Sequence, residues 1–349
     1  MLNERDAIQI MGAGPSGLTA AIALARAGRS VVVYERAGDV GSRRDGDLEA
    51  LEDFTMREGV WDELTRWGIA KNFHATPIDS LTCFGPGFRD AITATDTTPF
   101  MHFVTRGPAD GSIDRALLAQ ACDAGVRVVF DRAAQPCEVD IVASGLRRPR
   151  AFAIGYNFET SAPNGAYIGL DATLTPQAYS YLAVCDGRGT IAACAFVPHK
   201  GMDANLQRVI AGFRSQLDFD MHDPRYFAAS VTFGIPQSAR RDGKLYVGEA
   251  AEVQDIWTGF GMRMGMAMGY LAARSLLDGS DFDALWRARC QRLMEAATVN
   301  RALQRTLGDY GFHLVRFLMG RSASRARAML YRHYNPTWYS ALLWPFARR

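Results

Sequence analysis

Three glycines near the start of the chain have the spacing of a loop that binds a dinucleotide. In the segment IMGAGPSGLTAAIALARAGRSVVVYER, residues 10–36, Gly12, Gly14 and Gly17 form the pattern GxGxxG. The first glycine permits a tight turn, the second lets a phosphate approach the backbone, and the third lets a helix pack closely on a strand. A pyrophosphate would then lie at a helix N-terminus, where unpaired N–H groups and about half a positive charge attract it.

The segments around these glycines follow the order that such a site requires. Residues 7–11 resemble a short buried strand, residues 16–27 carry apolar side chains at helical spacing, and residues 30–34 form a β-branched strand. Glu35 follows this strand, where a carboxylate can accept both hydroxyls of an adenosine ribose. The unit predicts the ADP end of NAD or FAD, bound by Gly12, Ala13, Gly14, Pro15, Ser16, Gly17, Glu35 and Arg36.

A second glycine turn, far along the chain, favours FAD over NAD. In KLYVGEAAEVQDIWTGFGMRMG, residues 244–265, a strand at residues 245–247 leads to Glu249. A turn of the form Gly-x-Gly then opens a helix rich in Gly, Ala and Met. This turn can place another helix N-terminus against the extended FAD molecule, which an NAD site does not need. The residues expected to bind FAD here are Glu249, Gly259, Gly261 and Met262.

With both turns, the chain resembles the FAD superfamily of geranylgeranyl reductases, aromatic-ring monooxygenases and flavin-dependent halogenases. In that superfamily a strand ending in Gly-Asp-Ala and a following Gly-x-Gly turn hold the ribityl chain and pyrophosphate, and here Glu249 replaces the Asp. The segment FVTRGPADGSIDRALLAQACDAGVRVVFD is similar to one whose Arg reaches the flavin side, which implies that role for Arg106. The family also implies a cofactor contact from Arg43 or Arg44.

Three departures from the superfamily's motifs bear on the reaction. Residues 38–51 contain no cysteine, so the Cys-x-Gly-Gly loop of the geranylgeranyl reductase branch is missing. Ser144 replaces the Asp of the Asp-Gly turn that serves FAD and NADPH in ring hydroxylases. The Trp-x-Trp-x-Ile-Pro motif of the halogenases is also missing, and Trp257 stands alone. The resemblance therefore implies an FAD-dependent oxidoreductase without identifying its branch.

The sequence is compatible with several reactions. We expect a geranylgeranyl-reductase-like reductase or dehydrogenase acting on a small or lipid-like apolar substrate. The alternative is a monooxygenase supplied by a separate flavin reductase; a non-catalytic flavoprotein or electron carrier is less favoured, because the chain has no Fe–S cysteine set. No second GxGxxG follows a strand, so NAD(P)H would serve as a transient electron donor or a partner would supply electrons. Candidate substrate or flavin contacts are Trp257, Phe260 and Tyr179, and no catalytic residue is assigned.

The predicted fold class is α/β, with a Rossmann-like domain built from discontinuous segments. We expect an FAD-binding domain in residues 1–75, 101–150 and 240–279. Short alternating runs between residues 151 and 233 predict an antiparallel sheet, so the substrate domain would comprise residues 76–100 and 151–239, with a helical region at 280–349. Because this sheet faces the flavin in the superfamily, candidate pocket residues are Tyr156, Phe158, Tyr179 and Tyr181.

Composition narrows the partners and the compartment. The net charge of +2 is too small to indicate nucleic acid as a partner. Six scattered cysteines, with no CxxC pair and no Cys/His cluster, indicate a reduced compartment and no metal site. No signal peptide or spanning segment is expected, so we predict a cytoplasmic protein.

The end of the chain suggests a membrane surface as a further partner. The last 40 residues carry aromatic residues and no Asp or Glu, together with Arg316, Arg321, Arg325, Arg327, Arg332, Arg348 and Arg349. Such a basic and aromatic segment can lie on an anionic bilayer. The alternative is a terminal helix pair that packs on the protein and exposes its Arg face. Peripheral membrane contact is therefore an expectation that the packing of these helices must test.

Overall fold

A six-stranded sheet contains the first glycine turn. The structure, a computed structural model, describes residues 7–145, 149–196, 201–320 and 322–347. The strand order is β15-β16-β9-β1-β2-β8, in which β15 alone runs antiparallel to its neighbour. The bounds are β1 (Ile8–Met11), β2 (Val31–Tyr34), β8 (Arg127–Val129), β9 (Ile141–Val142), β15 (Arg240–Arg241) and β16 (Lys244–Tyr246). The strands predicted around both glycine motifs are confirmed.

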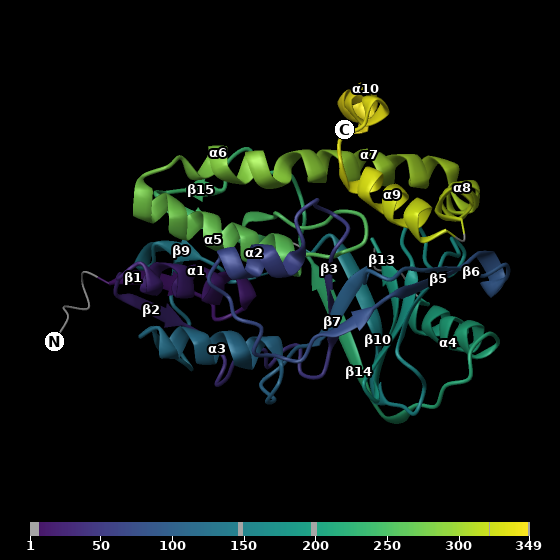
Figure 1. The fold of residues 1–349 in the computed structure, drawn as a ribbon, viewed down its shortest axis with the longest axis horizontal. Coiled ribbons are helices and arrows are strands. Elements are labelled where there is room, and N and C mark those ends of the chain that lie inside the picture. Colours follow the sequence, from purple (N-terminus) through teal and green to yellow (C-terminus); the bar gives the residue numbers. More distant parts are fainter. Residues whose placement is uncertain (1–6, 146–148, 197–200, 321, 348–349) are drawn as a thin grey trace.

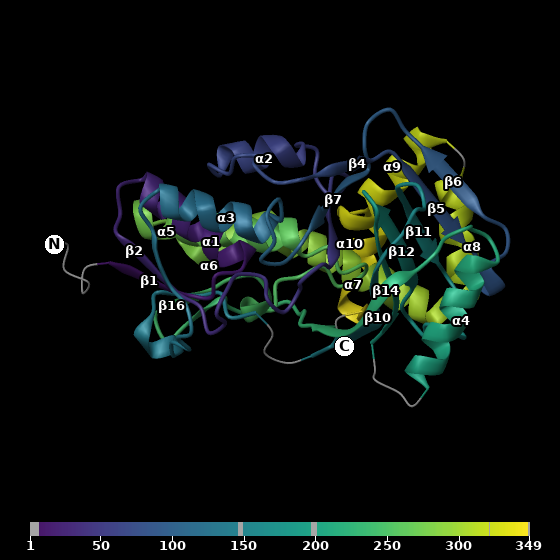
Figure 2. The ribbon, with the colours of Figure 1, turned by 90° about the horizontal axis from the view of Figure 1, so that it is seen from below.

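Three helices pack beside this sheet (Figures 1 and 2). They are α1 (Pro15–Arg26), α3 (Ile113–Asp123) and α5 (Met262–Asp278). Helix α1 buries Leu18, Ile22 and Leu24 in the main core, as its apolar periodicity predicts. The connection from a parallel strand through a helix to the next strand is the βαβ arrangement that the opening motif requires.

A seven-stranded sheet forms the other end of the molecule (Figure 1). Its order is β14-β10-β13-β12-β11-β5-β6, and its neighbours are antiparallel except for the parallel pair β11 and β5. The bounds are β5 (Ser80–Phe84), β6 (Ile92–Thr95), β10 (Ala151–Glu159), β11 (Gly165–Gly169), β12 (Ser180–Cys185), β13 (Arg188–Ala195) and β14 (His222–Val231). The predicted antiparallel sheet is therefore largely confirmed.

One part of that prediction is wrong. Residues 202–214, expected within the antiparallel region, form the helix α4 (Met202–Arg214). The helix buries Leu206, Val209, Ile210 and Phe213 against one face of the sheet. Since these residues recur at helical spacing, burial of one stripe favours a helix over a strand here.

A three-stranded sheet lies between the two larger sheets (Figure 1). It has the order β3-β7-β4, with β3 (Leu48–Glu52), β4 (Thr76–Ile78) and β7 (Met101–Thr105). The backbone N–H of Leu48 donates to the hydroxyl of Thr190 on β13 at 3.3 Å, which ties this sheet to the seven-stranded one. Helix α2 (Val60–Arg66) follows β3 and buries Val60 and Leu64.

The chain ends in helices, as the sequence predicts. They are α6 (Phe282–Trp286), α7 (Arg292–Leu307), α8 (Asp309–Met319), α9 (Ala323–Tyr334) and α10 (Trp338–Ala347), with a π-helical turn between α6 and α7. Helix α7 runs along the top of the molecule in Figure 1, with α8 and α9 beyond it and α10 outermost. Within the described part of the chain, no helix is both long and apolar enough to cross a bilayer. The bounds of the three predicted domains stay a prediction.

Candidate functional site

One cavity of about 740 Å³ joins the two glycine turns to the seven-stranded sheet. Its size is typical of a pocket for a cofactor and a substrate. The predicted residues that line it are Gly12, Ala13, Gly14, Pro15, Ser16, Glu35, Arg36, Arg43, Arg44, Arg106, Tyr179, Glu249, Trp257, Gly259, Phe260, Gly261 and Met262. The structure thus brings together segments that are separated by more than two hundred residues in the sequence.

The three glycines of the first turn are needed for different structural reasons. Gly12 has φ +100°, and a Cβ there would lie 2.3 Å from the carbonyl oxygen of Ala143. A Cβ on Gly17 would lie 2.0 Å from the carbonyl oxygen of Gly12, so Gly17 serves the packing of α1 behind the turn. At Gly14 a Cβ would meet no heavy atom within 4 Å. The space in front of Gly14 therefore fits a ligand group that approaches the backbone at the start of α1.

Glu35 lies at the end of β2, where its carboxylate faces the same turn. Oε2 accepts a hydrogen bond from the backbone N–H of Ala13 at 2.9 Å, and Oε1 accepts one from Ala37 at 3.0 Å. These bonds fix the carboxylate at the wall of the cavity. The position suits recognition of a ribose diol next to the glycine turn.

Close helix packing brings the second turn beside the first. Gly265 and Gly269 lie one turn apart on α5 and face the start of α1. A Cβ on Gly269 would lie 2.0 Å from the carbonyl oxygen of Ser16, and one on Gly265 would lie 2.8 Å from the Ser16 hydroxyl oxygen. Larger residues would separate the helices. The two glycines therefore allow the N-termini of α1 and α5 to meet at one cavity.

The loop before α5 is held by Asp255, which sequence reasoning missed. Its carboxylate accepts hydrogen bonds from the backbone N–H groups of Trp257, Thr258 and Phe260 at 2.9 to 3.1 Å. It also accepts one from the hydroxyl of Tyr334 on α9 at 2.9 Å. Asp commonly organises a turn through the N–H groups that follow it, and this local pattern is the available sequence signal.

The C-terminal helices contact the same loop. Trp257 donates its indole N–H to Gln304 on α7 at 2.6 Å, and its ring lies 3.9 Å from that of His333 on α9, between centroids. The hydroxyl of Tyr179, just before β12, donates to the carbonyl oxygen of Thr258. The predicted contacts Trp257 and Tyr179 are therefore fixed in the cavity wall by the sheet and by α7 and α9.

A cluster of charged side chains lines part of the cavity. Arg106, after β7, pairs with Asp114 at 2.7 Å and with Glu49 at 2.8 Å. Arg106 is thus a buried, paired cation at the cavity wall, where we expected an arginine directed toward the flavin. Glu249 faces the same cluster, and burial raises its pKa to about 7, with the nearby Arg44 opposing the rise. Glu49 and Glu249 both line the cavity, where they can contact a polar ligand group.

The seven-stranded sheet supplies an apolar wall of the cavity. For two of its residues, the prediction of a pocket position is wrong. Tyr179 and Tyr181 line the cavity. Phe158 instead packs in the second core with α4, and Tyr156 packs against that same core. Successive strand residues point to opposite faces, so a sheet with α4 on one face directs only alternate side chains to the cavity. Other apolar residues of the wall are Leu81, Phe103, Ile168, Phe196, Phe227 and Phe233.

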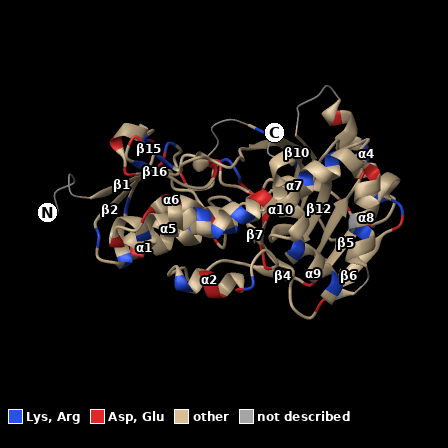
Figure 3. Cartoon of the chain, turned by 90° about the horizontal axis from the view of Figure 1, so that it is seen from above, with Lys and Arg blue, Asp and Glu red and all other residues tan. Residues whose placement is uncertain are grey.

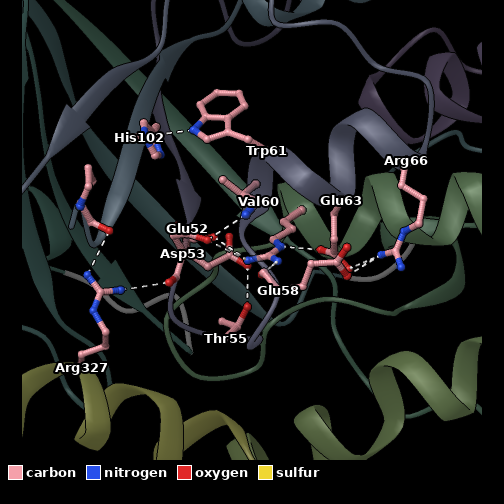
Figure 4. A network of polar contacts seen from close by, with 12 residues as sticks. Glu52, Asp53, Thr55, Glu58, Val60, Trp61, Glu63, Arg66, His102 and Arg327 are labelled. Carbon is pink, nitrogen blue, oxygen red and sulfur yellow. Dashed lines mark hydrogen bonds and ion pairs between the residues drawn. The ribbon is translucent and has the colours of Figure 1, made fainter. Parts of the chain in front are cut away.

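A buried ionic network fixes the start of α5 from behind (Figure 4). Arg263, the second residue of α5, donates to the Glu63 carboxylate at 2.7 Å and to the carbonyl oxygens of Glu52 and Glu58 at 3.0 and 2.7 Å. Arg289 also pairs with Glu63, at 3.0 Å. The network joins α2 and the end of β3 to the helix whose N-terminus faces the cavity.

Comparisons with known proteins agree with this geometry. The family model described as an NAD(P)-binding Rossmann-like domain matches residues 10–49. The comparison with curated proteins found no significant match.

Solved structures show similarity over nearly the whole chain. The fold is similar to that of a geranylgeranyl bacteriochlorophyll reductase-like protein from Thermoplasma acidophilum, with 15% identity, a TM-score of 0.74 and 98% of each chain covered. For the flavin-dependent brominase Bmp2 the identity is 15%, the TM-score 0.64 and the coverage 97% of each chain. For PqsL, a probable FAD-dependent monooxygenase from Pseudomonas aeruginosa, they are 14%, 0.59, and 89% of this chain and 99% of that one. The chain therefore has the fold that this reductase-like protein, the brominase and PqsL share, as the sequence motifs predicted.

Proposed function

We propose that the chain is an FAD-dependent oxidoreductase that acts on a small or lipid-like apolar substrate. The observation that carries this proposal is one continuous cavity, lined by the glycine turn with Glu35 and by an apolar sheet face. The open space before Gly14 and the second helix start at Gly261 fit an extended dinucleotide. FAD, when bound, supplies the redox chemistry, and the chain binds and orients both molecules.

A reductase or dehydrogenase is the first candidate reaction. Burial raises the pKa of the Tyr179 and Tyr181 phenols well above their usual value and that of the Cys194 thiol to about 12. These groups therefore remain protonated at neutral pH and present weak hydrogen-bond donors in a largely apolar wall. Such a wall suits an uncharged substrate portion, and the similarity to a reductase-like protein supports this candidate.

A monooxygenase supplied by a separate flavin reductase is the second candidate. Similarity to a probable FAD-dependent monooxygenase supports it. The same apolar wall would serve it, because oxygen chemistry at a flavin is carried by the cofactor more than by protein groups.

One experiment separates these candidates. Purified protein is loaded with FAD, its visible spectrum is recorded, and NADH or NADPH is added without oxygen before O₂ is admitted and peroxide is measured. Bleaching by nicotinamide followed by slow reoxidation supports the reductase. No bleaching, together with oxygen-dependent product from chemically reduced protein, supports the monooxygenase. A protein that takes up no FAD refutes the proposed function.

We also propose that the C-terminal helices contact an anionic membrane surface. Of the ten exposed large apolar side chains among the described residues, eight lie here: Leu307, Tyr310, Leu314, Phe317, Leu318, Trp338, Leu342 and Phe346. Figure 3 looks onto these helices and shows basic positions, Lys and Arg in one colour, along α7, α8 and α9. Two of the expected basic residues serve the fold instead, since Arg316 is buried and Arg327 pairs with Asp96 at 3.0 Å. Arg321, Arg348 and Arg349 lie outside the described residues.

Flotation with phosphatidylglycerol vesicles tests this contact. The intact protein should float, whereas the triple variant Trp338→Ser, Leu342→Ser, Phe346→Ser should stay in the soluble fraction, because each change removes an apolar side chain that would enter the interface. Tyr226→Ser, at an exposed position on β14, is the matched control. Equal flotation of the triple variant and the control would contradict the assignment to α10. These changes leave Tyr334 and its bond to Asp255 in place.

A further inference from the structure

Arg301 on α7 lies against the aromatic end of the cavity. Its guanidinium carbon is 3.5 Å from the ring centroid of Phe196 and 5.2 Å from that of Phe233, and both rings line the cavity. Nearly one helical turn further along, Gln304 holds Trp257. This face of α7 is therefore fixed against the cavity wall, which Arg301 contacts through Phe196 and Phe233.

The charges around Arg301 are all of its own sign. Among the described residues, the charged groups that act on it are Arg305, on the next turn of α7, and Arg150, just before β10. Burial and these two cations lower the pKa of Arg301 to about 10. Residues 146–148 and 197–200, which lie outside the described residues and next to Arg150 and Phe196 in the sequence, contain no Asp or Glu. The protein thus concentrates positive charge at this edge of the cavity.

Several other buried or half-buried arginines among the described residues have a carboxylate partner. Arg106 pairs with Asp114 at 2.7 Å, Arg263 with Glu63 at 2.7 Å and Arg327 with Asp96 at 3.0 Å. Within the described residues no carboxylate oxygen lies within 4 Å of the Arg301 guanidinium. A partly desolvated cation without a counterion is costly unless an anion from outside neutralises it.

We propose that Arg301, assisted by Arg305 and Arg150, binds the anionic head of an amphiphilic substrate whose apolar part occupies the sheet side of the cavity. This inference rests on the proposed function and names its substrate class: a long apolar chain with a phosphate or carboxylate. Stacking on Phe196 fixes the guanidinium plane and leaves its N–H edge for the anion. A planar guanidinium matches phosphate and carboxylate oxygens with paired hydrogen bonds.

The shape of the site agrees with one amphiphile that spans both regions. Phe196 and Phe233 belong to the cavity wall and at the same time support Arg301, so the charged and apolar parts of the site are adjacent. Arg150 directly precedes Ala151 and Phe152, which also line the cavity. An apolar chain against the sheet would therefore bring a terminal anion to the three arginines.

Calorimetric titration with two probes of equal chain length tests the proposal. Decyl phosphate and decanol are titrated, below micelle-forming concentrations, into the FAD-loaded protein and separately into the flavin-free protein. We expect decyl phosphate to bind at least about tenfold more tightly than decanol, as hydrogen bonds to charged groups contribute. Arg301→Gln should remove most of this preference and leave decanol binding unchanged, and Arg301→Lys should retain part of it.

The controls distinguish this site from general charge effects. Arg208→Gln, on the exposed side of α4 across the sheet, should bind both probes as the native protein does. An Arg301→Gln protein that keeps the native preference for decyl phosphate overturns the proposal, and so does a native protein without that preference. Because the flavin-free titration needs no cofactor, loss of the proposed flavin function and loss of the anion site give different results.

Flotation of the Arg301→Gln protein with phosphatidylglycerol vesicles distinguishes two sources of the anion. If Arg301→Gln loses the decyl phosphate preference and still floats with vesicles, the site takes a substrate molecule withdrawn from the bilayer or free in solution. If flotation is lost together with that preference, the site takes the headgroup of a lipid that remains in the bilayer.

Discussion

Two glycines of the first turn allow ligand binding to be separated from packing by single substitutions. Gly14 has φ −80° and ψ 176°, a conformation that alanine adopts freely, and its Cβ would enter open cavity. At Gly17 the Cβ would lie 2.0 Å from the Gly12 carbonyl oxygen and 3.2 Å from the Ala143 Cβ. Gly14→Ala should therefore act on the ligand, and Gly17→Ala on the fold.

The expected magnitudes follow from these contacts. Gly14→Ala should leave the free energy of unfolding within about 0.5 kcal/mol, since no protein atom is displaced. It should weaken FAD binding by roughly tenfold to a hundredfold, because the methyl group holds a phosphate away from the helix N–H groups. Gly17→Ala should cost about 3 kcal/mol of stability, as overpacking against backbone forces α1 away from β1.

Urea unfolding of the flavin-free proteins measures the first quantity, and calorimetric titration with FAD measures the second. Each variant serves as the control for the other, because each adds one methyl group and the two positions are three residues apart. Native FAD affinity in Gly14→Ala would refute a phosphate position in front of Gly14. An equal loss of stability in Gly14→Ala and Gly17→Ala would refute the open space at Gly14.

Further predictions concern the two ends of the cavity and the buried carboxyls. Glu35→Gln should weaken FAD binding about tenfold in the same titration, because a neutral amide accepts ribose hydroxyls less strongly; native affinity would contradict the ribose assignment. Burial raises the pKa of Glu52 from 4.5 to about 7, so the folded protein retains a proton that the unfolded chain releases, and stability should fall as pH rises from 4.5 to 7. The fall is on the order of 3 kcal/mol for this group, Glu249 adds to it in the same window, and urea midpoints against pH should be flatter for Glu52→Gln. Trp257→Phe, which removes the indole bond to Gln304, should alter the flavin absorption spectrum with a loss of about 1 kcal/mol in stability; an unchanged spectrum would place the flavin elsewhere.

Local sequence patterns predicted helices and strands more reliably than they predicted which face of the sheet meets the cavity. The strands and helix around Gly12 were predicted because glycine spacing and apolar periodicity act within a few residues. Helix α4 was missed, although Leu206 and Phe213 lie on one helical stripe, because strand-like runs surround it. Phe158 was assigned to the wrong face, since alternation fixes which residues share a face without fixing which face meets the cavity.

The binding turns are encoded by short local patterns of residues. Gly12, Gly14 and Gly17 set a backbone path that few other residues allow, and Glu35 follows from the length of one βαβ unit.

Assembly of the site depends on packing between segments that are distant in the chain. Packing of Gly269 on Ser16 brought the second turn to the first, and Asp255 met Tyr334 across 79 residues of chain. Arg301 came to stack on Phe196 because α7 packs over the sheet. Contacts of this kind depend on shape complementarity between distant segments, which neither the periodicity nor the spacing of a single sequence specifies.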